Sequence, residues 1–240
     1  VPNGSSGIEI CCVGNGASNN TIGGTAAGAA NIISGNTGKG ILHRAGSGNG
    51  ILTNSIYNNA GGIGIDLNAD NVTVNNGTTN ASLPNYEMDF PVFTSAVLAN
   101  TTLTVAGYVG SAPSQSTFAS ARVEIFKSDN DASGNGEGQT YLGYLTADAS
   151  GNFSGSLTVS GLTSGDKITG TATDGSNNTS EFGANFSIIV TYYSKGSLAV
   201  NTASNWNTKR DGTGTDASSF GSTDTWVIQN THSMHGQHFY

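Results

Sequence analysis

The stretch Asn31–Leu67, NIISGNTGKGILHRAGSGNGILTNSIYNNAGGIGIDL, matches itself at an offset of about 23 residues. The matched pairs are Asn31 with Asn54, Ile33 with Ile56, Asn36 with Asn59 and Gly38 with Gly61. A period of this size, carried by Asn, Gly and Ile, is typical of a solenoid in which each repeat forms one coil. The apolar residues come in very short alternating runs, which favour short strands over helices. The sequence therefore predicts a β-solenoid in which stacked Asn residues hydrogen-bond along a ladder.

The composition predicts an ordered, turn-rich, all-β protein. Only 10% of the 240 residues are charged, and 35 residues are Gly. Disordered chains are usually rich in charge or Pro, whereas only 4 prolines occur here. Regularly spaced Ile, Val, Leu and Phe supply enough apolar surface for narrow β cores.

The charge balance excludes some functional classes. A net charge of −8 argues against a nucleic-acid partner, because such a protein needs a basic face to replace counterions. The acidity is compatible with a divalent cation or with simple solubility. No run of about 20 apolar residues occurs, so we expect no membrane span in this chain.

The repeat pattern changes twice along the chain. Residues 1–96 are expected to form solenoid coils and an exit segment. Residues 97–190 carry strands of period two separated by turn signals, which predicts a β-sandwich of immunoglobulin-like type. Residues 191–240 restart a β-rich pattern and are predicted to begin a second solenoid-like module. The chain is thus expected to be a slice of a longer, modular, rod-like protein.

Several stretches resemble one family of large bacterial secreted and cell-surface proteins. ASNNTIGGTAAGAANIISGNTGKGI and NSIYNNAGGIGIDLNAD are similar to the last coils of its right-handed parallel β-helix, and PNYEMDFPVFTSA (Pro84–Ala96) resembles its exit segment. EGQTYLG and DASGNFSGSL are similar to the Ig-like module that follows the helix, and the spacing of Trp206 and Trp226 resembles the opening of another solenoid. The resemblance implies an adhesin-like architecture. It says little about function, because the same coils occur in enzymes and adhesins alike.

One loop carries the spacing of a cation site. Oxygen-bearing residues alternate in DNDASGNGE, and Gly134 stands where a calcium loop needs a sharp turn. The candidate calcium ligands are Asp129, Asp131, Ser133, Asn135 and Glu137. Thr140 stands where the bidentate Glu of such a loop would be, and no helices are expected on either side. The alternatives are a calcium site and an acidic hairpin loop.

Two other patterns have a metal or thiol interpretation. His232, His235 and His238 have a spacing that could hold zinc or nickel, or they could form a loose tail. Cys11 and Cys12 are adjacent, and neighbouring side chains on a strand point to opposite faces. We expect packed or unpaired thiols, because a disulfide between neighbours would be strained.

Catalytic and sugar-binding interpretations have few candidate residues. A β-helix enzyme gathers charged groups along one groove, and the charged residues of the coils are Glu9, Lys39, His43, Arg44 and Asp66. We expect Lys39 and Arg44 to be solvated surface groups, and we expect no enzyme. Sugar binding needs exposed aromatic rings, for which Tyr108, Tyr141, Tyr144, Trp206 and Trp226 are available, but core packing also consumes such residues.

These observations favour a structural or adhesive segment of a large extracellular bacterial surface protein, acting as a rod-like stalk or filament component. The expected partners are neighbouring modules of the same chain, identical subunits and surface glycans, and calcium is the candidate cofactor. The alternative is a secreted polysaccharide-binding or polysaccharide-degrading β-helix protein. It would be favoured by Glu9, His43 and Asp66 in one groove, or by an exposed aromatic platform.

Overall fold

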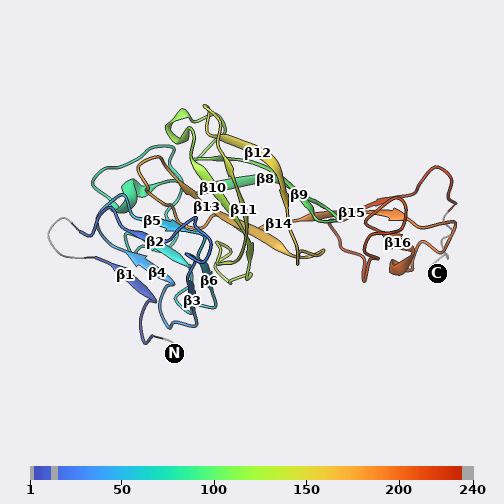
Figure 1. Cartoon of the computed structure of the whole chain (residues 1–240), viewed down its shortest axis with the longest axis horizontal. Helices are drawn as coiled ribbons and strands as arrows, with labels where there is room; N and C mark the ends of the chain where they lie inside the picture. Colours follow the sequence, from blue (N-terminus) through green and yellow to red (C-terminus); the bar gives the residue numbers. More distant parts are fainter. Residues whose placement is uncertain (1–2, 12–15, 234–240) are drawn as a thin grey trace.

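The computed structural model describes residues 3–11 and 16–233. Within these ranges the regular structure is strands and short 3-10 helices, so the all-β prediction is confirmed. The molecule is elongated, with the N-terminal strands near one end and the last strands near the other (Figure 1). None of the helices in the described ranges is long and apolar enough to cross a membrane.

Short parallel strands form three stacks in the N-terminal part of the chain. The first stack joins β1 (Ile8–Ile10), β4 (Ile41–His43) and β7 (Ile65–Leu67), the second joins β2 (Thr21–Gly23) and β5 (Gly50–Leu52), and the third joins β3 (Ile32–Ser34) and β6 (Ser55–Tyr57). Ile33 pairs with Ile56, the same match that the sequence repeat makes. We call β1–β7 and their connections the parallel stack.

The parallel stack is filled by one line of aliphatic side chains. Its buried members are Ile10, Ile33, Ile41, Ile51, Ile56, Ile65 and Leu67. Parallel pairing places like residues above one another, as for Ile41 and Ile65. Alternate residues of a strand point to opposite faces, so each strand of three residues contributes one or two side chains to this core. Burying one Ile or Leu stabilises the fold by about 2 kcal/mol.

Two further sheets share a second core. A four-stranded sheet has the order β11 (Gly138–Thr146), β10 (Arg122–Ser128), β13 (Lys167–Thr173) and β14 (Phe186–Ser187). A long sheet has the order β12 (Asn152–Thr158), β9 (Thr102–Val109), β8 (Pro91–Ala99), β15 (Ile189–Ser194) and β16 (Trp206–Asn207). Most of these strands pair antiparallel, whereas β8 and β15 pair parallel. Val123 and Ile168 from the first sheet pack in one cluster with Leu103 and Val105 from the second.

In the part of the chain that the structure describes, three short 3-10 helices lie in the connections. They are η1 (Pro84–Glu87), η2 (Ser116–Phe118) and η3 (Ala203–Asn205). The first helix leads from the parallel stack into β8, and its Asn85 is fully buried. Phe118 of the second helix packs into the core between the two sheets.

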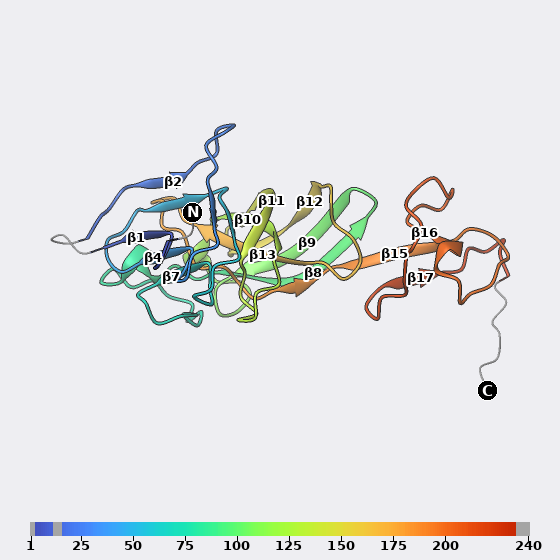
Figure 2. The same cartoon turned by 90° about the horizontal axis from the view of Figure 1, so that it is seen from below.

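Strand β15 belongs to two parts of the molecule. Its first residues pair with β8, and its last residues pair with β16 and with β17 (Thr225–Val227). It runs out of the central sheets towards the C-terminal end (Figure 2). The predicted boundaries at 96/97 and 190/191 fall inside β8 and β15. The change of sequence pattern at both places therefore lies within a continuous strand.

Candidate functional site

The strongest concentration of buried polar groups lies where the parallel stack meets the four-stranded sheet. The stack contains ladders of Asn residues, as the sequence predicts. The backbone N–H and side-chain Nδ2 of Asn36 both donate to Oδ1 of Asn59, at 3.2 and 2.7 Å. Asn31 makes the same pair of bonds to Asn54, both at 3.0 Å. Each rung therefore needs an acceptor from the coil that follows.

Glu137 supplies that acceptor for the last rung. Its Oε2 accepts from the backbone N–H of Asn59 and its Oε1 accepts from Asn59 Nδ2, both at 2.8 Å. The side chain is fully buried. Burial raises the pKa of Glu137 to about 7, the bonds from Asn59 oppose this shift, and the nearby Asp129 carboxylate adds to it. A glutamate from beyond the stack thus occupies the place of the next Asn.

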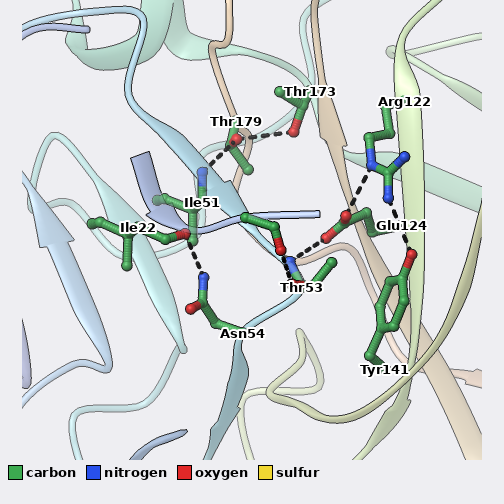
Figure 3. Close-up of polar contacts among 10 residues, drawn as sticks. Ile22, Ile51, Thr53, Asn54, Arg122, Glu124, Tyr141, Thr173 and Thr179 are labelled. Carbon is green, nitrogen blue, oxygen red and sulfur yellow. Dashed lines mark hydrogen bonds and ion pairs between the residues drawn. The ribbon is translucent and has the colours of Figure 1, made fainter. Parts of the chain in front are cut away.

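Strand β5 is the last strand of its stack. The N–H groups along its free edge, including that of Thr53 just after the strand, donate to side chains of the four-stranded sheet and of the segment that follows β13. Thr179 Oγ1 accepts from the N–H of Ile51 at 2.9 Å, and Glu124 Oε2 accepts from the N–H of Thr53 at 2.7 Å (Figure 3). Alternate N–H groups of a parallel strand point to the same edge. These two side chains therefore satisfy an edge that would otherwise be buried without partners.

Arg122 holds Glu124 in place. Its Nε donates to Glu124 Oε1 at 2.9 Å, and its Nη2 donates to the Tyr141 hydroxyl at 3.1 Å (Figure 3). Burial raises the pKa of Glu124, whereas the bond from the Thr53 N–H and the charge of Arg122 lower it. The guanidinium thus compensates a fully buried carboxylate.

Other backbone N–H groups at this end of the stack also donate to side chains from outside it. Leu67 at the end of β7 donates its N–H to Glu181 Oε1 at 2.8 Å, and Gly48 donates its N–H to Asn178 Oδ1 at 2.7 Å. Asn85 Oδ1 accepts from the N–H of Asn49 at 3.0 Å. The last coil is therefore capped by η1, the four-stranded sheet and the segment between β13 and β14. We call this contact the capping junction.

Aromatic side chains seal the capping junction. Phe126 and Phe182 are buried in the same cluster as the aliphatic core of the parallel stack. Their ring centroids lie 5.5 Å apart with planes at 89°, an edge-to-face contact. The stack and the four-stranded sheet therefore share one core.

The predicted calcium residues are divided between this junction and the loop itself. Asp129 Oδ2 accepts from the N–H of Asn58 at 3.0 Å, and its Oδ1 accepts from the N–H groups of Asp131 and Glu137. Asp131 Oδ1 accepts from the N–H of Ser133, whose hydroxyl accepts from the N–H of Asn135. These contacts are those of an acidic hairpin loop, and calcium binding by this loop stays a prediction.

The charged residues considered for an enzymatic groove lie in different surroundings. Glu9 and Arg44 form an exposed ion pair at 2.7 Å. His43 is fully buried inside the stack, where its Nε2 lies 3.1 Å from Asn49 Nδ2, and burial lowers its pKa to about 4. Asp66 is buried in β7, and its Oδ2 lies 3.3 Å from Lys39 Nζ.

The structure also contains an acidic cluster that the sequence analysis did not predict. One carboxylate oxygen from each of Asp66, Asp70 and Glu181 lies within 4.8 Å of the others. Burial raises the pKa of Glu181 to about 8, the N–H groups of Thr73 and Leu67 oppose this shift, and the charges of Asp66 and Asp70 add to it. The spacing of the two Asp residues was a local signal, but nothing in the sequence joins them to Glu181.

The aromatic candidates are largely packed. Trp206 is buried, and Trp226 stacks on Tyr192 with ring centroids 4.7 Å apart. Tyr144 is half exposed, with the Arg122 guanidinium 3.6 Å from its ring centroid.

The remaining metal and thiol candidates lie near or in the undescribed segments. His232 Nδ1 lies 2.8 Å from the Ser194 hydroxyl, and His235 and His238 lie outside the described residues. The expectation of packed or unpaired thiols is wrong for Cys11, which is disulfide-bonded. Cys11 follows the end of β1, so the alternation of side chains along a strand does not govern it. Cys12 lies outside the described residues.

No protein-family model matches the chain. The adhesin-like resemblance noted from the sequence therefore stays a prediction.

Proposed function

We propose that this chain is a rod-like structural segment of a large extracellular bacterial surface protein. In this proposal the parallel stack is the end of a right-handed parallel β-helix, the two central sheets are an Ig-like sandwich, and the residues after β15 begin a second solenoid-like module. Parallel pairing in three stacks supports the first assignment. Two mostly antiparallel sheets around one core support the second.

The capping junction is the observation that carries the proposal. Glu124, Glu137 and Glu181 reach from beyond the stack to backbone N–H groups of its last coil. Phe126 and Phe182 extend the core of the stack across the same contact. A flexible linker would leave the two parts free to rotate, whereas this contact fixes their orientation. Such a junction suits a stalk that must keep its length and direction.

The second connection supports the same role. Strand β15 pairs with β8 at one end and with β16 and β17 at the other. Tension along this strand passes from the central sheets into the C-terminal part through its backbone and its ladder hydrogen bonds. Each connection along the molecule is thus a shared sheet or a shared core.

Adhesion by such a rod would depend on many weak contacts held close together. The partners we propose are neighbouring modules of the same long chain, identical subunits and surface glycans. The exposed Ile32 of β3, at 74% accessibility, lies at the opposite end of the stack from the capping junction. Strand edges at that end can pair with a further coil.

Small-angle X-ray scattering of the full chain in solution tests the rod. We expect one elongated shape that fits a single conformation, and the same shape in low and high salt. A scattering curve that requires several relative orientations of the stack and the central sheets would contradict the proposal. Assays on a polysaccharide panel test the adhesive role: depolymerisation of any member would overturn it in favour of an enzyme.

A further inference from the structure

Three acidic side chains converge at the edge of the capping junction. Asp66 lies in β7, Asp70 lies in the turn after it, and Glu181 lies between β13 and β14. The Thr73 hydroxyl contacts both Asp70 Oδ1 at 3.2 Å and Glu181 Oε1 at 3.3 Å. A hydroxyl carries one hydrogen, so it can donate to only one of these two oxygens at a time. The Asp70 and Glu181 oxygens therefore lie close together, and Glu181 is already held by the backbone N–H groups of Leu67 and Thr73.

Asp66 supplies an independent observation. Its side chain is 1% exposed, and its Oδ1 has no hydrogen-bond partner among the described residues. A buried carboxylate oxygen without a donor is costly, and buried polar atoms in folded proteins nearly always have a partner. An orphaned, buried oxygen in a group of three carboxylates indicates that a ligand completes the site.

The charge of the cluster agrees with a cationic ligand. Lys39 Nζ lies 3.3 Å from Asp66 Oδ2, and it also donates to Asn71 Oδ1 at 2.6 Å. The Lys39 ammonium thus contacts one of the three acidic side chains, Asp66. A divalent cation would neutralise the excess negative charge, and it would attract all three carboxylates at once.

We propose that Asp66, Asp70 and Glu181 bind one calcium ion between the last coil of the parallel stack and the segment after β13. The donors are all oxygen atoms, which suit a hard cation better than zinc or copper, whose protein sites usually include nitrogen or sulfur ligands. Calcium accepts irregular sets of six to eight oxygens, whereas magnesium demands near-octahedral geometry. Glu181 also accepts from the Leu67 N–H, so the ion would reinforce the capping junction.

Isothermal titration calorimetry of the full, chelator-treated chain with calcium chloride tests the site. We expect one calcium ion per chain, and thermal unfolding at a higher temperature when calcium is present. Asp70 is exposed, so Asp70→Asn should fold normally and should weaken calcium binding by about tenfold or more. The matched control is Asp211→Asn, which removes an exposed acidic group outside both candidate sites and should leave the affinity unchanged. Asp131→Asn removes a candidate ligand of the 129–137 loop, so it distinguishes calcium binding by that loop from binding at the proposed site.

A second variant distinguishes a cation site from a structural ion pair. Lys39→Met keeps most of the side-chain length and removes the competing positive charge, so calcium should bind more tightly. Weaker binding in this variant would contradict the proposal. So would absence of calcium binding by the unmodified chain, binding that depends on Asp131 and not on Asp70, or binding that neither Asp70→Asn nor Asp131→Asn changes.

Discussion

Glu137 occupies the place of an asparagine that would follow Asn59 in the ladder. Its two carboxylate oxygens accept from the Asn59 backbone N–H and side-chain Nδ2 at 2.8 Å. The bonds reproduce those that Asn59 accepts from Asn36 with its own Oδ1. Glu137 lies outside the stack, and its carboxylate therefore continues the hydrogen-bonding pattern of the Asn ladder and ends it.

Glu137→Ala should destabilise the chain by about 2–4 kcal/mol at pH 7, because two buried donors of Asn59 lose their acceptors. Urea unfolding followed by circular dichroism measures the change. The control is Glu9→Ala, which breaks an exposed ion pair with Arg44 and should cost less than about 1 kcal/mol. Equal losses in the two variants would show that the last rung needs no acceptor.

The pKa of Glu137 predicts a pH dependence with a definite sign. The folded-state pKa of about 7 lies above the ordinary glutamate value of 4.5, so the stabilising contribution is complete below about pH 4.5 and is lost as the pH rises through 7. Between pH 8 and pH 6 it should grow by about 1 kcal/mol. Both the original chain and Glu137→Gln retain His43 and Glu181, so the difference between their unfolding free energies isolates Glu137. A difference that stays constant from pH 8 to pH 6 would contradict the assignment.

Phe182→Ala tests whether the parallel stack and the four-stranded sheet unfold together. The ring lies against Phe126 and packs in the core of the stack, so its removal should cost about 3–5 kcal/mol and loosen the junction. We expect two separate transitions in differential scanning calorimetry for this variant, and one transition for the original chain. Phe220 is 48% exposed, and Phe220→Ala should keep the single transition. One transition in Phe182→Ala would mean that the hydrogen bonds alone couple the two parts.

The sequence predicted the repeating part of this structure and missed the capping junction. The match of Ile33 to Ile56 is local and periodic, and it reappears as strand pairing. Glu124 and Glu181 contact groups 71 and 114 residues away, and each occurs once, so no period marks them. They are recognised only when the fold brings the last coil against the four-stranded sheet.

Glu137 was identified from the sequence, but its role was not. Its spacing from Asp129 made it a candidate calcium ligand, because alternating oxygens within one loop are visible in the sequence. In the structure its side chain faces Asn59, which lies 78 residues earlier. Local spacing of oxygen-bearing residues predicts a loop at 129–137. The direction of the Glu137 side chain depends on the parallel stack, against which the four-stranded sheet packs.

His43 gives the opposite pH dependence to Glu137. Its folded-state pKa of about 4 lies below the ordinary histidine value of 6.5, so its stabilising contribution is present above about pH 6.5 and is lost as the pH falls towards 4. The loss should reach about 3 kcal/mol. Inside the stack the charged imidazole would belong to a residue paired with Ile10 and Leu67, and it would lie beside Asn49 Nδ2, which is itself a donor. Nuclear magnetic resonance should show the His43 ring signals, assigned by their absence in His43→Leu, titrating near pH 4. Titration between pH 6 and 7 would mean that water reaches the ring, and the acid-induced loss of stability would then have another origin.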